Sequence, residues 1–130
     1  MTAVAEGFGL SRIGQIAMTV EDLPRAVAFY RDVLGMRFLF EAPPAMAFFD
    51  CGGVRLMLSR AEKPEFDHPA SILYFSVGDI RAQYAEMKAR GVQFEDEPHL
   101  VAKLPQMEIW MTFFRDSENN VMALMSEVRV

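Results

Sequence analysis

The chain has 130 residues, of which 52% are hydrophobic and 24% are charged, so its composition is typical of one compact globular domain with an apolar core. Its formal net charge is -5 and it has no run of lysine or arginine, so we expect no nucleic-acid partner. No window approaches the roughly 18 apolar residues of a membrane span, and Met1–Leu10 lacks a signal-peptide pattern, so we expect a cytoplasmic protein without membrane contact.

The first half of the chain predicts one strand, a helix and three further strands. Asp22 offers a side-chain oxygen that caps the helix at its start, and Gly35 supplies the positive φ that ends it. Gly52 and Gly53 permit a tight hairpin turn after Cys51. Because Cys51 is the only cysteine, no intrachain disulfide forms, and we interpret it as a buried, inert thiol rather than a catalytic nucleophile. The predicted strands are residues 13–20, 36–41, 46–50 and 54–59.

The second half repeats this pattern after a polar, proline-containing linker over residues 60–69. Asp79 caps the second predicted helix, and Gly91 closes it. The run Asp116–Asn120 is rich in turn-forming residues and separates the last two strands. The predicted strands are residues 71–77, 92–95, 108–114 and 121–127.

The repetition is visible in the residues as well as in the pattern. Val20-x-Asp22-Leu23 matches Val77-x-Asp79-Ile80, and Gly35-Met36-x-Phe38 matches Gly91-Val92-x-Phe94, at an offset of about 57 residues. We therefore predict an α+β fold of two βαβββ modules that pack by pseudo-symmetry. The predicted organisation is an N-terminal tail (1–10) and a single domain (11–130), with module one at 12–59, the linker at 60–69 and module two at 70–127.

Three segments resemble a known family. Ile13–Leu23 and Ala28–Met36 resemble the opening of the vicinal oxygen chelate superfamily, and Phe114–Leu124 resembles its last turn and strand. That superfamily contains glyoxalase I, extradiol dioxygenases, fosfomycin and bleomycin resistance proteins and methylmalonyl-CoA epimerase. The resemblance covers Arg12–Glu127. It implies a curved mixed sheet that forms a cup around a substrate, often across a dimer, with a divalent metal held by His or Glu on the inner strands.

The four metal-ligand positions that this resemblance implies fall on Gln15, Met57, Ile72 and Ala123. Glutamine replaces histidine at the first position in one subclass of glyoxalase I, so Gln15 alone is compatible with a metal. Met57 offers a soft thioether, however, and Ile72 and Ala123 have no donor atom. We therefore expect no metal cofactor at these positions. A relocated metal site that uses His68 or His99, both expected in connecting segments, stays open.

Strand alternation predicts which side chains line the cup. Tyr74 is interpreted equally well as a core aromatic or as a ligand contact, and Arg55 as a solvent-exposed residue near the Gly52–Gly53 turn. Trp110 is either an anchor between layers or a stacking surface for a planar ligand. The side chains expected on the cup face are Gln15, Ala17, Thr19, Arg55, Met57, Ser59, Ile72, Tyr74, Ser76, Ala123 and Met125. The candidate ligand contacts are Gln15, Met57, Ile72, Tyr74, Trp110, Ala123 and Met125.

Pro98–Trp110 is long for a connection between strands, and long ordered loops often cover sites. His99 in this stretch is a candidate general base or anion ligand, and Glu108 is a second candidate catalytic residue. The alternative is that His99 is a surface residue bonded to backbone.

Two functions follow as hypotheses. The first is a binding protein that holds a small apolar or aromatic organic molecule without a metal, as the resemblance to bleomycin resistance proteins implies. The second is an enzyme of lyase, isomerase or dioxygenase type with an atypical or relocated site using Gln15, His99 or Glu108. An apolar cup mouth also predicts a homodimer, either domain-swapped or side by side.

Overall fold

The computed structural model describes residues 9–61 and 64–130, so most of the predicted tail and two residues of the linker lie outside the described part of the chain. Among the helices of that part, none has the length and apolar character needed to cross a lipid bilayer. The elements in chain order are β1 (Gln15–Thr19), α1 (Leu23–Ala28), η1 (Phe29–Val33), β2 (Arg37–Ala42), β3 (Met46–Cys51), β4 (Val54–Ser59), η2 (Pro64–Phe66), β5 (Leu73–Ser76), α2 (Ile80–Ala89), β6 (Gln93–Phe94), β7 (His99–Lys103), β8 (Met107–Arg115) and β9 (Val121–Arg129).

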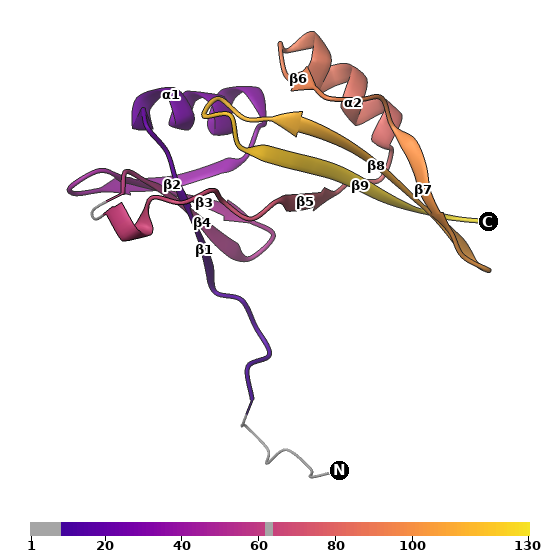
Figure 1. The fold of residues 1–130 in the computed structure, drawn as a ribbon, viewed down its shortest axis with the longest axis horizontal. Helices are drawn as coiled ribbons and strands as arrows, with labels where there is room; N and C mark the ends of the chain where they lie inside the picture. Colours follow the sequence, from indigo (N-terminus) through magenta and orange to yellow (C-terminus); the bar gives the residue numbers. More distant parts are fainter. Residues whose placement is uncertain (1–8, 62–63) are drawn as a thin grey trace.

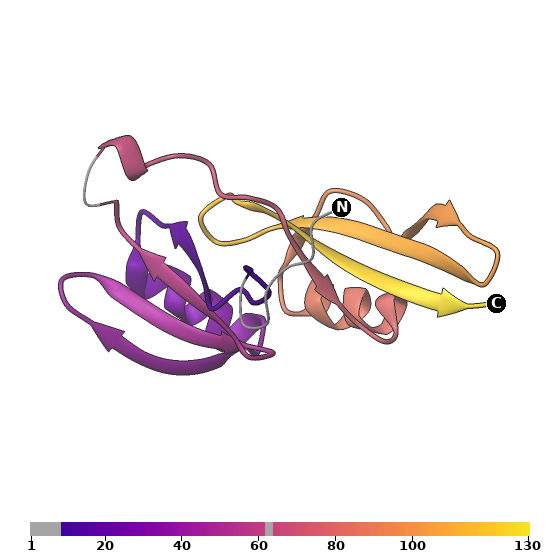
Figure 2. The same cartoon turned by 90° about the horizontal axis from the view of Figure 1, so that it is seen from below.

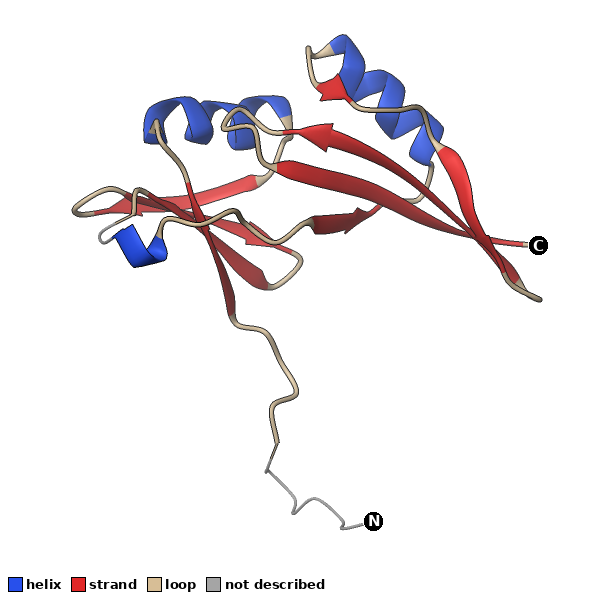
Figure 3. Cartoon of the chain, viewed as in Figure 1, coloured by secondary structure: helices blue, strands red, loops and turns tan. Residues whose placement is uncertain are grey.

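The strands form two mixed sheets, which confirms the predicted α+β fold class. The first sheet has the order β1-β4-β3-β2. The second has the order β5-β9-β8-β6, with β7 also paired to β8. In each sheet one pair is parallel, β1 with β4 and β5 with β9, and the remaining pairs are antiparallel. Helices α1 and α2 lie on the same side of the sheets (Figures 1 and 3), and the view from below shows the strands in front of them (Figure 2). Each sheet therefore has one face covered by a helix and one helix-free face.

The predicted helix signals are confirmed. Asp22 accepts a hydrogen bond from the backbone N–H of Arg25 at 3.0 Å, and Asp79 accepts one from Ala82 at 3.1 Å. Gly35 follows the first helical segment with a φ of 70°, in the left-handed region that glycine enters without strain. Gly91 follows α2 with a φ of 92° in the same way. The helices of the two modules thus begin at a capping aspartate and end at a glycine.

The hairpin between β3 and β4 also forms as predicted. Gly52 and Gly53 have φ values of 61° and 92°, which the tight turn requires. The turn pairs Cys51 with Val54. Burial, together with the charge of Asp50, raises the pKa of the Cys51 thiol, so the thiol is a poor nucleophile at neutral pH.

The second module differs from the prediction between residues 95 and 110. The expected long connection is a strand, β7, which forms a hairpin with β8, so His99 lies in a strand rather than in a connecting segment. β6 and β7 both pair with β8 and behave as one strand that is interrupted by residues 95–98. Asp96 sits in the interruption, where its carboxylate accepts hydrogen bonds from the Thr112 hydroxyl at 2.9 Å and the Phe113 N–H at 2.9 Å. These bonds tie the interruption to β8.

The two modules share one core. Buried side chains from both belong to the same cluster, including Tyr30 and Leu58 of module one and Phe114 and Met122 of module two. The hydroxyl of the fully buried Tyr30 donates to Asp116 Oδ2 at 2.7 Å. Burial, and then the charge of Asp116, raise the pKa of Tyr30 far above its ordinary value, so the hydroxyl keeps its proton.

A second polar contact joins the modules near the helix start. Arg25 donates from Nε to Glu118 Oε2 at 2.8 Å, and Glu118 Oε1 accepts from the backbone N–H groups of Glu21 and Asp22. The Glu118 side chain is 2% exposed. Burial alone would raise its pKa, but the bonds from Arg25, Asp22, Ser117 and Glu21 outweigh this effect and lower the pKa of Glu118 to about 2. The turn before β9 is thus held against module one by the ionised carboxylate of Glu118.

Candidate functional site

The helix-free face of the first sheet, called here the sheet A face, carries the side chains that the strand alternation predicts. Gln15 lies opposite Arg55, and Ala17 lies opposite Met57. The antiparallel pairing then places Phe48 opposite Met57 and Phe40 opposite Phe48. The face therefore combines an apolar centre with a polar pair at one end; its members are Gln15, Ala17, Phe40, Met46, Phe48, Arg55 and Met57.

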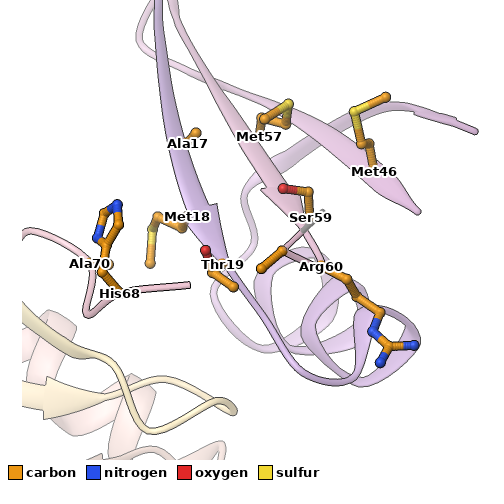
Figure 4. Close-up of a pocket in the computed structure, with 10 residues that line it drawn as sticks. Ala17, Met18, Thr19, Met46, Met57, Ser59, Arg60, His68 and Ala70 are labelled. Carbon is orange, nitrogen blue, oxygen red and sulfur yellow. The ribbon is translucent and has the colours of Figure 1, made fainter. Parts of the chain in front are cut away.

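A pocket of about 300 Å³ lies on this face. Figure 4 shows that Met46, Met57 and Ser59 project into it from β3 and β4, while His68 and Ala70 approach from the connection that leads to β5. Most of the lining is apolar, with polar atoms supplied at the rim by Thr19, Ser59, Arg60 and His68. This arrangement is suited to burying an apolar body while a few polar groups orient it.

Gln15 and Arg55 form an ordered polar pair beside Met57. Arg55 donates from Nε to Gln15 Oε1 at 2.8 Å, and Gln15 Nε2 lies 3.7 Å from the Met57 sulfur. The guanidinium carbon of Arg55 is 5.3 Å from the centre of the Phe48 ring. Phe48 stacks in turn on Phe40, with ring centres 4.7 Å apart. The arginine is therefore held in place by a hydrogen bond on one edge and an aromatic face beneath it.

His68 lies in the connection between the modules, as the sequence predicts, and lines the pocket. Its Nδ1 is 3.0 Å from the carbonyl oxygen of Pro69. Because a carbonyl oxygen only accepts, Nδ1 carries the proton in this contact, and Nε2 of a neutral ring is then an acceptor. His68 can therefore accept a hydrogen bond from a bound molecule at the pocket rim.

The helix-free face of the second sheet carries the other predicted cup residues. Tyr74 lies opposite Ala123, which lies opposite Phe113, and the Tyr74 and Phe113 rings meet edge to face with centres 6.0 Å apart. Ala123 has no exposed surface, whereas Ile72 and Tyr74 are 44% and 45% exposed. Met125 lies next to Ala123 on the same face and is half-buried. The exposed surface here is thus aromatic and aliphatic, and Ala123 lies beneath it.

Trp110 and Glu108 lie on the opposite face of the second sheet, toward α2. Arg81 of α2 stacks over the Trp110 ring at 5.3 Å, and the Trp110 N–H donates to Glu108 Oε1 at 3.3 Å. The structure therefore places Trp110 as an anchor between sheet and helix, away from Tyr74 and Met125. The ligand contact that the sequence suggested for Trp110 does not fit this position.

His99 lies on β7, opposite Met111. Its Nδ1 is 2.9 Å from the Glu97 carbonyl oxygen and 3.7 Å from Asp96 Oδ2. This matches the alternative of a surface histidine bonded to backbone. Since Glu108 points to the other face, the structure does not bring the two candidate catalytic residues together.

The donors at the four positions that the resemblance implies do not fit a divalent metal. Gln15 directs its only strong donor, Oε1, at the cationic guanidinium of Arg55, which would repel a metal ion there. Met57 supplies a thioether, and neither Ile72 nor Ala123 has a donor atom. Across residues 9–61 and 64–130, no three His, Cys, Asp or Glu side chains group closely enough to hold a metal ion.

Phe40, Phe48 and Met46 are site residues that the sequence reasoning missed. A signal for Phe48 was present, because a two-residue turn at Gly52–Gly53 pairs Cys51 with Val54, and counting back along both strands pairs Phe48 with Met57. No comparable local signal existed for Phe40, since β2 is irregular between Phe38 and Phe40.

Known proteins are similar to this chain in sequence and in fold. The chain is 28% identical over 123 residues to the uncharacterized protein YraH of Bacillus subtilis, covering 85% of this chain and 94% of the relative. A lactoylglutathione lyase from Agrobacterium tumefaciens is similar in structure, with a TM-score of 0.69 and 25% identity over 90% of this chain and 94% of that one. TnmS3, an antibiotic binding protein from Streptomyces sp. CB03234, is also similar in structure, with a TM-score of 0.72 and 21% identity. The match covers 92% of this chain and 98% of TnmS3.

The model of one family matches most of the chain, residues 12–124. The matched segment contains module one, module two as far as residue 124 within β9, and every residue that lines the pocket. The chain therefore belongs to the Glyoxalase/Bleomycin resistance protein/Dioxygenase superfamily.

Proposed function

We propose that this protein binds a small, largely apolar or aromatic organic molecule on the sheet A face, over Met57, and that it does so without a divalent metal. The observation that carries this proposal is the pocket of about 300 Å³ whose apolar lining includes Ala17, Met46 and Met57. Thioether side chains are unbranched and polarizable, so they adapt to an aromatic ring and make favourable sulfur contacts with it. His68 supplies a hydrogen-bond acceptor at the pocket rim, and the amide group of Gln15 lies beside Met57.

Fold similarity does not choose between binding and catalysis, because relatives in structure include both a lyase and an antibiotic binding protein. The choice rests on the residues. The described part of the chain brings no general base next to a nucleophile at the pocket, and the two candidate catalytic residues lie on different faces of the second sheet. Binding is what the remaining side chains support.

We also propose a homodimer that closes over the bound molecule. The helix-free faces of both sheets lie on the same side of the protein and expose Phe40 (46%), Ile72 (44%) and Tyr74 (45%). A second copy can cover these rings, which water solvates poorly.

Light scattering is expected to give a mass twice that of the 14.7 kDa chain at micromolar concentration. The double variant Ile72→Asp and Tyr74→Asp should be monomeric, because each copy would bury new unpaired charges in the interface. Val101→Asp, on the exposed edge strand β7, is the matched control and should remain dimeric. A monomeric wild type would refute the dimer.

The binding proposal is tested by filling the pocket. Ala17 is exposed and lines the pocket, so Ala17→Trp should occupy the space without disturbing the core. A panel of planar aromatic compounds is expected to raise the melting temperature of the wild-type protein, because a compound that binds only the native state stabilises it. Calorimetry should show that Ala17→Trp weakens binding at least tenfold, about 1.4 kcal/mol.

Ala85→Trp, an exposed site on α2, is the matched control and should bind as the wild type does. Dialysis against a chelator should leave the affinity unchanged. If binding instead required zinc, nickel, iron or manganese, the metal-free part of the proposal would be wrong. If the wild type formed lactoylglutathione from a hemithioacetal and His99→Ala did not, the enzyme hypothesis would replace this proposal.

A further inference from the structure

Arg55 differs in its partner from the four arginines of the structure that form ion pairs. Four arginines pair with carboxylates through Nε at 2.6 to 3.0 Å; these are Arg25, Arg31, Arg90 and Arg115. Arg55 instead donates to the neutral amide oxygen of Gln15. Asp50 lies opposite it in the β3–β4 register, yet no described carboxylate comes within 4 Å of its guanidinium. The positive charge of Arg55 is thus positioned but not neutralised by any described residue.

The contacts of Arg55 also determine which edge of the guanidinium is presented. Its Nε donates a hydrogen bond to Gln15, and one planar face of the guanidinium lies over the Phe48 ring. The two terminal nitrogens are left on the far edge, and this edge is the fork that matches the two oxygens of a carboxylate. Because the side chain is already ordered, less conformational entropy is lost when it binds such a group.

The position of Arg55 relates this charge to the pocket. Arg55 and Met57 are on the same face of β4, and Phe48 lies directly across from Met57. A molecule that rests its aromatic ring on Met57 therefore has Arg55 at one end and the pocket rim at the other.

We propose that Arg55 binds the acid group of the ligand, so that the molecule bound on the sheet A face is a small aromatic carboxylate. This inference rests on the proposed binding function and specifies the chemical class of its ligand. Gln15 acts as a positioning residue: its oxygen holds the Nε edge of Arg55 and so directs the terminal fork toward the acid.

Pairs of ligands with the same ring and either a carboxylate or a primary amide separate the effect of ligand charge on affinity from the effect of ligand shape. Benzoate, phenylacetate, cinnamate and indole-3-acetate have the same ring systems as their primary amides but differ in charge. The wild-type protein is expected to bind the carboxylates at least about tenfold more tightly than the amides, since hydrogen bonds to a charged partner contribute more than neutral ones. Calorimetry or ligand-observed NMR measures both series.

Variants at Arg55 and Gln15 then test the assignment. Arg55→Gln should abolish the preference for the carboxylates and weaken amide binding much less than carboxylate binding. Arg55→Lys should retain part of the preference, because an ammonium lacks the planar fork. Gln15→Glu should neutralise Arg55 and weaken carboxylate binding far more than amide binding. Gln15→Met, which removes the acceptor but adds no charge, should give an intermediate loss.

Arg60 provides the matched control, because it lines the pocket and follows Ser59 at the end of β4 that lies away from Arg55. Arg60→Gln is expected to keep the preference for carboxylates. The inference fails, and the binding function survives, if the wild type binds acids and amides equally or if Arg60→Gln rather than Arg55→Gln removes the preference. If neither series binds the wild type, both the inference and the proposed function fail.

Discussion

Replacement of Asp116 by alanine is expected to lower the free energy of unfolding by about 3 to 5 kcal/mol, because each buried donor left without a partner costs about 1 to 3 kcal/mol. The Asp116 carboxylate accepts from the Tyr30 hydroxyl at 2.7 Å and from the backbone N–H groups of Glu118 and Asn120, both at 2.8 Å. Its side chain joins module one to the turn before β9. Chemical denaturation of the wild type and the variant measures this difference.

Two further variants control this prediction. Tyr30→Phe removes one of the bonds and keeps the turn, so it should cost less, about 1 to 2 kcal/mol. Asp67→Ala, at an exposed position in the connection between the modules, should change stability by no more than about 0.5 kcal/mol. A loss below about 1 kcal/mol in Asp116→Ala would show that the modules do not depend on this carboxylate.

Acid should weaken the second contact between the modules. The folded-state pKa of Glu118 is about 2, below the ordinary value of 4.5. A lowered pKa means that the stabilisation is fully present above pH 4.5 and is lost as the pH falls toward 2. The expected loss over this range is about 2 to 3 kcal/mol, because the carboxylate is buried while Arg25 remains half exposed.

Denaturation at a series of pH values tests this dependence. Glu118→Gln should be less stable than the wild type at pH 7 and should lose less stability between pH 4.5 and 2. Glu86→Gln breaks the exposed ion pair with Arg90 and should leave the acid dependence of the wild type unchanged. Equal acid dependence in the wild type and Glu118→Gln would contradict the assignment of this pKa.

Most of the fold could be predicted because its signals are local. A helix cap such as Asp22 acts on an N–H three residues away, and the Gly52–Gly53 turn determines the pairing of two adjacent strands. Strand alternation also assigned the correct face to Gln15 and Met57, because side-chain direction in a strand depends only on position along it.

The segment around His99 could not be predicted in the same way. β6 has two residues, and β7 begins after an interruption that Asp96 stabilises by bonding to β8. Neither piece shows a long apolar alternation, and Leu100 and Val101 of β7 are largely exposed. The strand forms because β8 offers a partner, which is a tertiary effect.

The role proposed for Arg55 also depends on contacts distant in sequence. In the sequence, Arg55 follows closely after Gly52 and Gly53 and is indistinguishable from an ordinary exposed arginine near a turn. Its hydrogen bond reaches Gln15, 40 residues away, and its aromatic partner Phe48 lies on another strand. Only the register of three strands brings these side chains to one place.

A crystal structure of the protein with indole-3-acetate bound tests the central claim most directly. The account predicts density for the ring over Met57 on the sheet A face, with the carboxylate at hydrogen-bond distance from the terminal nitrogens of Arg55. Density for the ligand beside His99 or Glu108, or at a metal ion held by other residues, would contradict it.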